Sequence, residues 1–128
     1  MKNKSRYFLA ELLGSCFLVM IIVGSGLMAE NLTNDVAVML IANTIATGAG
    51  LFVLITVFAD VSGAHFNPFV SIAMAITGKL KRKLLAYYII AQLVGCLIGV
   101  GLAISFLNMK FMNYLLSQEM GFTYSHLR

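Results

Sequence analysis

The sequence contains few charges and a single proline. Its 128 residues include nine Lys and Arg, five Asp and Glu, one proline, two cysteines and no tryptophan. Charged residues make up 11% of the chain, whereas a soluble domain carries about 25%. This scarcity excludes a soluble globular domain and a disordered segment, and two cysteines are too few for a disulfide-stapled secreted module.

The chain is instead rich in long apolar runs. Hydrophobic residues account for 60% of the chain, and its mean hydropathy is +0.91. Three runs, at about 7–28, 36–59 and 84–107, each supply the roughly 20 apolar residues that a helix needs to cross a membrane. The first run has some features of a signal peptide, but its length and the presence of Glu11 disfavour that interpretation. The sequence therefore predicts an all-α membrane protein with three transmembrane helices.

The positive charges predict how these helices cross the membrane. The net charge is +4, but the cations flank apolar runs and form no polar face, which disfavours nucleic acid as a partner. Three cations precede the first run, four precede the third and two follow it: Lys2, Lys4, Arg6; Lys79, Lys81, Arg82, Lys83; Lys110, Arg128. Since cations accumulate on the cytoplasmic side, we expect a cytoplasmic N-terminus and an external C-terminus.

A shorter apolar segment at about 67–78 separates the second run from the third. Its length as a helix is about half the thickness of a bilayer. Asn67 suits the N-cap, Pro68 suits the first helical position, and Gly78 suits the end of the helix. We therefore expect a re-entrant half-helix that starts near the membrane midplane, with residues 61–66 lining a cavity. An interfacial loop followed by a short surface helix is the alternative.

Three segments carry a resemblance to a known family. Residues 62–68 read Ser-Gly-Ala-His-Phe-Asn-Pro and resemble the first Asn-Pro-Ala signature of the aquaporin and glycerol-facilitator family, the major intrinsic proteins. Residues 10–15, Ala-Glu-Leu-Leu-Gly-Ser, resemble the family's first-helix pattern, and residues 88–95 resemble its third-helix pattern. The resemblance implies half of an aquaporin-like fold. The motifs are most similar in character to a bacterial branch of the family, which implies a bacterial inner (plasma) membrane.

The sequence departs from the family pattern in two ways. Phe69 stands where the family signature has alanine, and a phenylalanine there would reshape the passage. Residues 1–108 resemble only the first of the family's two inverted repeats, and Val70 stands where the second repeat carries its filter arginine. Residues 109–128 resemble the external loop that joins the two repeats, which favours a split or interrupted gene, or a fragment.

The resemblance also implies roles for individual residues. Pore-lining positions surround the signature: Gly63, Ala64, His65, Asn67, Pro68 and Phe69. The Asn67 amide would donate a hydrogen bond to the permeating molecule, although a plain N-cap is the alternative. Glu11 would anchor the re-entrant loop, with a proton relay as the alternative. Thr47 aligns with a filter position, where a small residue would widen the pore, unless it simply packs. No metal or cofactor is expected, because Cys16 and Cys96 lie on different spans without ligand spacing.

These observations favour a half-length channel subunit for water or small uncharged solutes such as glycerol or metalloid hydroxides. A complete pore needs a second, inverted half-helix, and the charge bias disfavours an inverted second copy of this chain. We therefore expect a separately encoded second half as partner within the lipid bilayer, with a homo-oligomer as the alternative. The alternative is a non-conducting fragment that binds relatives without forming a pore. A coupled transporter has thin support, and an enzyme has none, since no nucleophile–base pair is evident.

Overall fold

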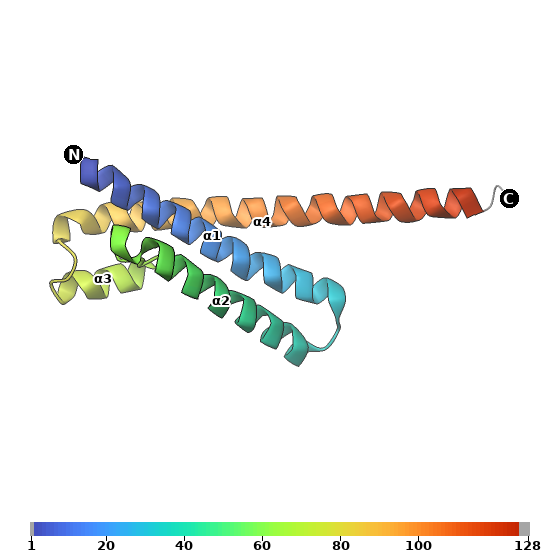
Figure 1. The fold of residues 1–128 in the computed structure, drawn as a ribbon, viewed down its shortest axis with the longest axis horizontal. Coiled ribbons are helices and arrows are strands. Elements are labelled where there is room, and N and C mark those ends of the chain that lie inside the picture. The colour runs from blue at the N-terminus through green and yellow to red at the C-terminus, as the bar shows by residue number, and fades with distance from the viewer. Residues whose placement is uncertain (1, 126–128) are drawn as a thin grey trace.

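The computed structural model describes the backbone of residues 2–125 and the side chains of residues 4–108. Four helices follow one another along the chain: α1 (Lys2–Leu32), α2 (Val36–Ser62), α3 (Pro68–Ile76) and α4 (Arg82–Ser125) (Figure 1). Within the described residues there are no strands. Three segments, Lys4–Leu32, Val36–Ser62 and Arg82–Asn108, are long and apolar enough to cross a membrane. The prediction of three long helices and one half-helix is confirmed.

The ends of α2 and α3 are set by local side-chain chemistry. The Asp35 carboxylate caps α2 by accepting hydrogen bonds from the backbone N–H groups of Ala37 and Val38, at 2.8 and 3.3 Å. Such caps satisfy the first N–H groups of a helix, which have no intrahelical partner. At the other end of α2, Gly63 adopts a φ of 90°, a left-handed conformation that glycine reaches without steric cost.

α3 has only nine residues and is therefore about 14 Å long, half of a bilayer. In Figure 1 it runs back toward the end of the molecule that carries the chain's N-terminus, so α3 begins part-way along the bundle. Gly78, with a φ of 78°, follows α3 in the turn that leads to α4. This is the geometry of a re-entrant segment.

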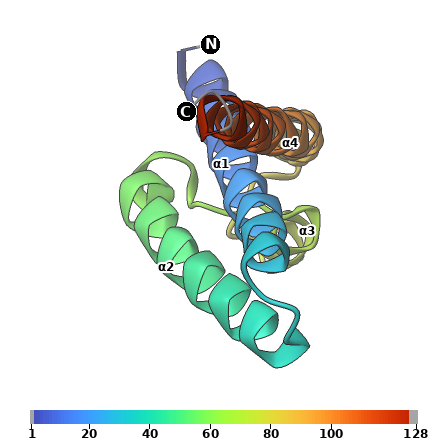
Figure 2. The ribbon, with the colours of Figure 1, turned by 90° about the vertical axis from the view of Figure 1, so that its right-hand side faces the viewer.

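α1 lies at the centre of the arrangement and packs against both α2 and α4, while α3 packs against α4. Figure 2 shows α4 end-on with α1 crossing beside it and α2 lying apart from α4. In the part of the chain that the structure describes, α2 packs along α1, and its last residue, Ser62, also contacts Tyr88 of α4. Large apolar side chains of α2 such as Leu40, Ile45 and Phe52 are consequently exposed, and a face of this size calls for lipid or a partner.

Two glycines allow α1 and α4 to approach closely. A Cβ atom on Gly95 would overlap the carbonyl oxygen of Leu12, and one on Gly99 would overlap that of Cys16. Small residues spaced four apart let two membrane helices bring their backbones together. The backbone of α1 thus lies directly on the Gly95–Gly99 ridge of α4.

α4 continues beyond the predicted end of the third span. The sequence predicts a loop-like tail from residue 109, whereas the structure continues the helix to Ser125. The physical reason is composition, since residues 109–125 contain no proline and include three Met and two Leu, which favour helix. Figure 1 shows α4 projecting past the α1–α2 turn. Residues 126–128 of this tail, including Arg128, lie outside the described residues, as does Met1.

Candidate functional site

The connection between α2 and α3, residues 63–67, has an unusual backbone conformation. Gly63, Ala64 and Phe66 adopt φ values of 90°, 50° and 49°. A left-handed conformation costs a non-glycine residue roughly 1–2 kcal/mol, so Ala64 and Phe66 need surrounding contacts to hold them there. This connection precedes Asn67 directly, and its contacts therefore decide where α3 begins.

The Glu11 carboxylate on α1 supplies the strongest of these contacts. Its side chain is fully buried, with 0% exposure. One oxygen accepts hydrogen bonds from the Ser62 hydroxyl at 2.6 Å and from the backbone N–H of His65 at 3.0 Å. The other accepts one from the backbone N–H of Phe66 at 2.8 Å. These N–H groups lie in an irregular segment, where no helical carbonyl oxygen accepts their hydrogen bonds. The carboxylate accepts these hydrogen bonds instead.

α4 completes the network with Gln92 and Tyr88. The buried Gln92 amide donates to the second oxygen of Glu11 at 2.7 Å and to the Ser71 hydroxyl of α3 at 2.9 Å. The His65 ring nitrogen Nδ1 lies 3.1 Å from the same hydroxyl. The Tyr88 hydroxyl donates to the carbonyl oxygen of Ser62 at 2.7 Å. One connected set of hydrogen bonds therefore joins α1, the connection, α3 and α4.

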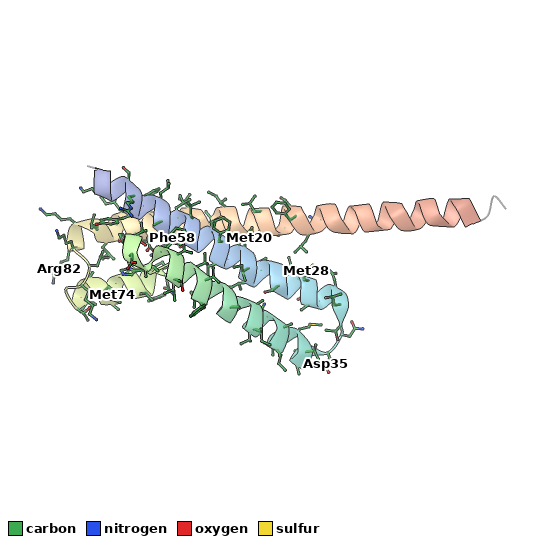
Figure 3. The ribbon with its side chains drawn as sticks, in the orientation of Figure 1. Met20, Met28, Asp35, Phe58, Met74 and Arg82 are labelled. Carbon is green, nitrogen blue, oxygen red and sulfur yellow. The ribbon has the colours of Figure 1, made fainter. Side chains whose placement is uncertain are left out.

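Phe66 adds an apolar contact to this polar network. Its ring is 4% exposed and occupies the space above Gly14, where a Cβ atom would overlap the ring. It meets Phe58 edge-to-face, with ring centroids 5.8 Å apart. Phe58 lies on the last turns of α2, beside the connection (Figure 3). The left-handed Phe66 is thus fixed both at its backbone, by Glu11, and at its ring.

Asn67 stands at the start of α3 with its side chain exposed. Its carbonyl oxygen Oδ1 accepts a hydrogen bond from the backbone N–H of Phe69 at 2.8 Å, as an N-cap does. Among the described residues no acceptor lies within hydrogen-bond distance of its amide nitrogen. Pro68 occupies the first helical position, and Phe69 is 81% exposed beside it. The Asn67 amide can therefore donate to a molecule that passes the half-helix.

The structure brings most of the residues singled out from the sequence together and leaves one apart. Glu11 binds the segment that contains Gly63, Ala64 and His65, and Asn67 follows directly. Thr47 lies elsewhere on α2. Its hydroxyl donates to the Asn43 side-chain oxygen at 3.1 Å, and the Asn43 amide donates to a carbonyl of α1 at 3.2 Å. Thr47 is thus part of the α1–α2 contact and not of the Glu11 network.

The sequence analysis assigned no role to Ser71, Tyr88 or Gln92. A signal for each was present in the spacing. Ser71 follows Asn67 by four residues on α3, and Gln92 follows Tyr88 by four on α4, so each pair shares one helix face. Polar side chains inside membrane helices face the protein interior rather than lipid. That reasoning would have directed Gln92 and Tyr88 toward the connection.

The comparison with known families decides what this arrangement is. Residues 1–126 match the family described as "Major intrinsic protein". The chain belongs to that family. Because major intrinsic proteins are membrane proteins and three helices here are long enough to span, the chain is an integral membrane protein.

Individual relatives within the major intrinsic protein family show how much of the chain is covered. The aquaglyceroporin AqpS of Rhizobium meliloti (strain 1021) is 52% identical over 77% of this chain and 42% of its own length. Mouse aquaporin-8 is 40% identical over 74% of this chain and 34% of its own. Aquaporin NIP1-2 of Arabidopsis thaliana is 40% identical over 68% of this chain and 29% of its own length. The matched part of the chain spans less than half the length of each of these relatives.

Replacing Gln92 by leucine should destabilise this major intrinsic protein by about 1–2 kcal/mol, because Glu11 and Ser71 each lose a buried hydrogen bond. Unfolding in mixed detergent micelles, followed by circular dichroism, measures this free energy. The matched control is Asn108→Leu, which removes an exposed amide from the same helix. Equal stability of the two variants would show that Gln92 does not hold α3.

Proposed function

We propose that the chain supplies one half of a channel for the passive permeation of water or small uncharged solutes, and that a complementary inverted half completes the pore. The observation that carries this proposal is α3, a half-length helix that starts part-way along the bundle and presents the Asn67 amide at its N-terminus. The names of the relatives, an aquaglyceroporin and several aquaporins, support water and glycerol-type solutes as the permeants.

The chemistry at the start of α3 suits neutral molecules. The Asn67 amide donates a hydrogen bond that replaces one lost to bulk water. The N-terminus of a helix carries about half a positive charge, which opposes protons and other cations. In this proposal the backbone carbonyls of Gly63, Ala64 and His65 accept hydrogen bonds from the solute. Pro68 and Phe69 shape the midplane, Thr47 widens the passage further along α2, and Glu11 anchors the connection.

The exposed surfaces support the need for a second half. Phe69 is 81% exposed and Phe52 is 73% exposed, although both lie on helices at membrane depth. Pores built from inverted repeats bring two half-helices together at the midplane, and the described residues contain one. A second half would pack against α2 and the start of α3, where residues 2–125 place no further helix.

The orientation in the membrane is part of the same proposal. The N-terminus and the α3–α4 turn, with Lys79, Lys81 and Lys83 in and just after that turn, lie at the same end of the molecule (Figure 1). This clustering supports a cytoplasmic N-terminus and an external C-terminus, because cations accumulate on the cytoplasmic side. A bacterial inner membrane is supported by the Rhizobium relative.

Stopped-flow light scattering on proteoliposomes tests the proposal. The chain is reconstituted alone and together with the second repeat of the Rhizobium aquaglyceroporin, expressed as a separate chain. We expect osmotic shrinkage faster than in empty liposomes only when both halves are present. Asn67→Asp should return the rate to that of empty liposomes, because aspartate still caps α3 but has no amide to donate. Asn34→Asp, in the α1–α2 turn, makes the same change away from the half-helix and should leave the rate unchanged.

The other outcomes of this experiment each contradict a part of the proposal. Fast shrinkage with the chain alone would show that identical copies close a pore, against the charge bias. Empty-liposome rates in both preparations, with insertion verified, would favour a non-conducting subunit. An unchanged rate in Asn67→Asp would remove Asn67 from the pathway.

A further inference from the structure

A cavity of about 700 Å³ opens at the end of the molecule that carries the N-terminus. Four lysines line it, Lys4 from α1 and Lys79, Lys81 and Lys83 from the turn into α4 and its first residues. Tyr7 and Tyr88 also contribute to its wall. A volume of this size is typical of sites for organic ligands.

The cavity lies at the level of the membrane surface. The spans formed by α1 and α4 begin at Lys4 and Arg82, so the residues at these positions mark where each helix enters the hydrocarbon. Met74 of α3, which lines the cavity, and Arg82, the first residue of α4, both lie at this end of the molecule (Figure 3). Lysines at this depth meet lipid headgroups rather than acyl chains.

The charge of the cavity favours an anion. Against four ammonium groups, the lining contributes one carboxylate, Asp60, from the described part of the chain. Apolar side chains also line the cavity, among them Met74, Leu80 and Leu84, and Leu80 is buried against Ala75 and Tyr88. The cavity thus combines lysines with an apolar lining.

We propose that this cavity binds the phosphate headgroup of an anionic phospholipid from the adjacent leaflet. Basic pockets between membrane helices suit such headgroups. A lipid fills both parts of the cavity, since its phosphate reaches the lysines and its glycerol and first acyl carbons cover Met74 and Leu84. A water-soluble phosphate ester satisfies only the lysines. The cavity shares Gly63 and His65 with the proposed passage, but the inference does not depend on permeation, because lipid binding is measured without a permeating solute.

Native mass spectrometry of the full chain in detergent, with equal amounts of phosphatidylglycerol and phosphatidylcholine, tests it. We expect adducts of phosphatidylglycerol to predominate. Lys79→Gln combined with Lys83→Gln should weaken phosphatidylglycerol binding by roughly 25-fold, or about fivefold for each charge. Arg6→Gln combined with Arg82→Gln removes the same charge nearby from residues that do not line the cavity, and should leave binding within about twofold. Circular dichroism verifies that both double variants keep their helices.

A separate arm adds glycerol 1-phosphate as a soluble competitor. We expect millimolar concentrations to leave the lipid adducts in place. Displacement at concentrations similar to those of the lipid would show that the cavity binds a phosphate ester and not a lipid. Equal adducts of both lipids would show that the cavity does not select an anionic headgroup. Equal losses in the two double variants would overturn the proposal in favour of diffuse surface charge.

Discussion

Replacing Glu11 by alanine should lower the free energy of unfolding by about 3–6 kcal/mol, the largest effect that we expect from a single substitution. Four donors lose their acceptor together: the Ser62 hydroxyl, the backbone N–H groups of His65 and Phe66, and the Gln92 amide. An unsatisfied buried donor costs about 1–3 kcal/mol in soluble proteins and less between membrane helices. Unfolding in mixed micelles measures the loss.

Two variants sharpen this experiment. Glu30→Ala removes an exposed carboxylate from the far end of the same helix and should change stability by less than about 0.5 kcal/mol. Glu11→Gln keeps one acceptor oxygen but directs an NH₂ group at donors, so we expect roughly half the loss of the alanine variant. If Glu11→Ala proves as stable as Glu30→Ala, the connection is held by other contacts, with Phe66 as the first candidate.

The second large effect should follow from Gly95→Ala. The added methyl group would overlap the carbonyl oxygen of Leu12, and a backbone atom cannot rotate away as a side chain can. α1 and α4 must then separate, which we expect to destabilise the protein by about 2–3 kcal/mol. Separation of the helices also stretches the hydrogen bond between Glu11 and Gln92. The loss of unfolding free energy should therefore exceed that of an added methyl group that only crowds its neighbours.

Gly101→Ala on the same helix provides the control. A Cβ atom there meets nothing within 4 Å, so no contact opposes it. Alanine favours helix over glycine, and the variant should be as stable as the parent or slightly more so. The close approach of α1 and α4 would be unimportant if both alanine variants unfolded at the same detergent fraction.

Local signals explain why the half-helix could be predicted from the sequence. Asn67 and Pro68 act on their immediate neighbours, as N-cap and first helical residue, and Gly78 accommodates the turn that follows. The predicted segment 67–78 therefore encloses the observed α3, Pro68–Ile76. The long spans could also be predicted from the sequence, because bilayer thickness fixes how many apolar residues a crossing requires.

The packing around the connection could not be predicted in the same way. Glu11 and Gln92 are 81 residues apart, and the space above Gly14 is filled by Phe66 from a distant turn. No local rule indicates which donor meets which acceptor over such separations. The family resemblance pointed to Glu11 as an anchor, but the hydrogen bond between Ser71 and Gln92 became apparent only once α3 and α4 were placed side by side.

Thr47 and the chain after residue 108 show two other limits. The resemblance implies a filter position for Thr47, but its hydroxyl contacts Asn43 within α2, and its role in a pore stays a prediction. For residues 109–125 the resemblance predicts a loop-like tail, whereas α4 continues through them to Ser125.

The distance in sequence between Glu11 and its partners has a consequence for synthesis of the protein. Ser62 lies 51 residues after Glu11, and a ribosome adds about 5–20 residues each second. For roughly 3–10 s the nascent α1 therefore carries a carboxylate that has none of its partners. A lone ionised group at the centre of a bilayer costs about 3 kcal/mol. During this interval the unpaired Glu11 weakens the insertion of α1, until the end of α2 leaves the ribosome and provides the missing donors.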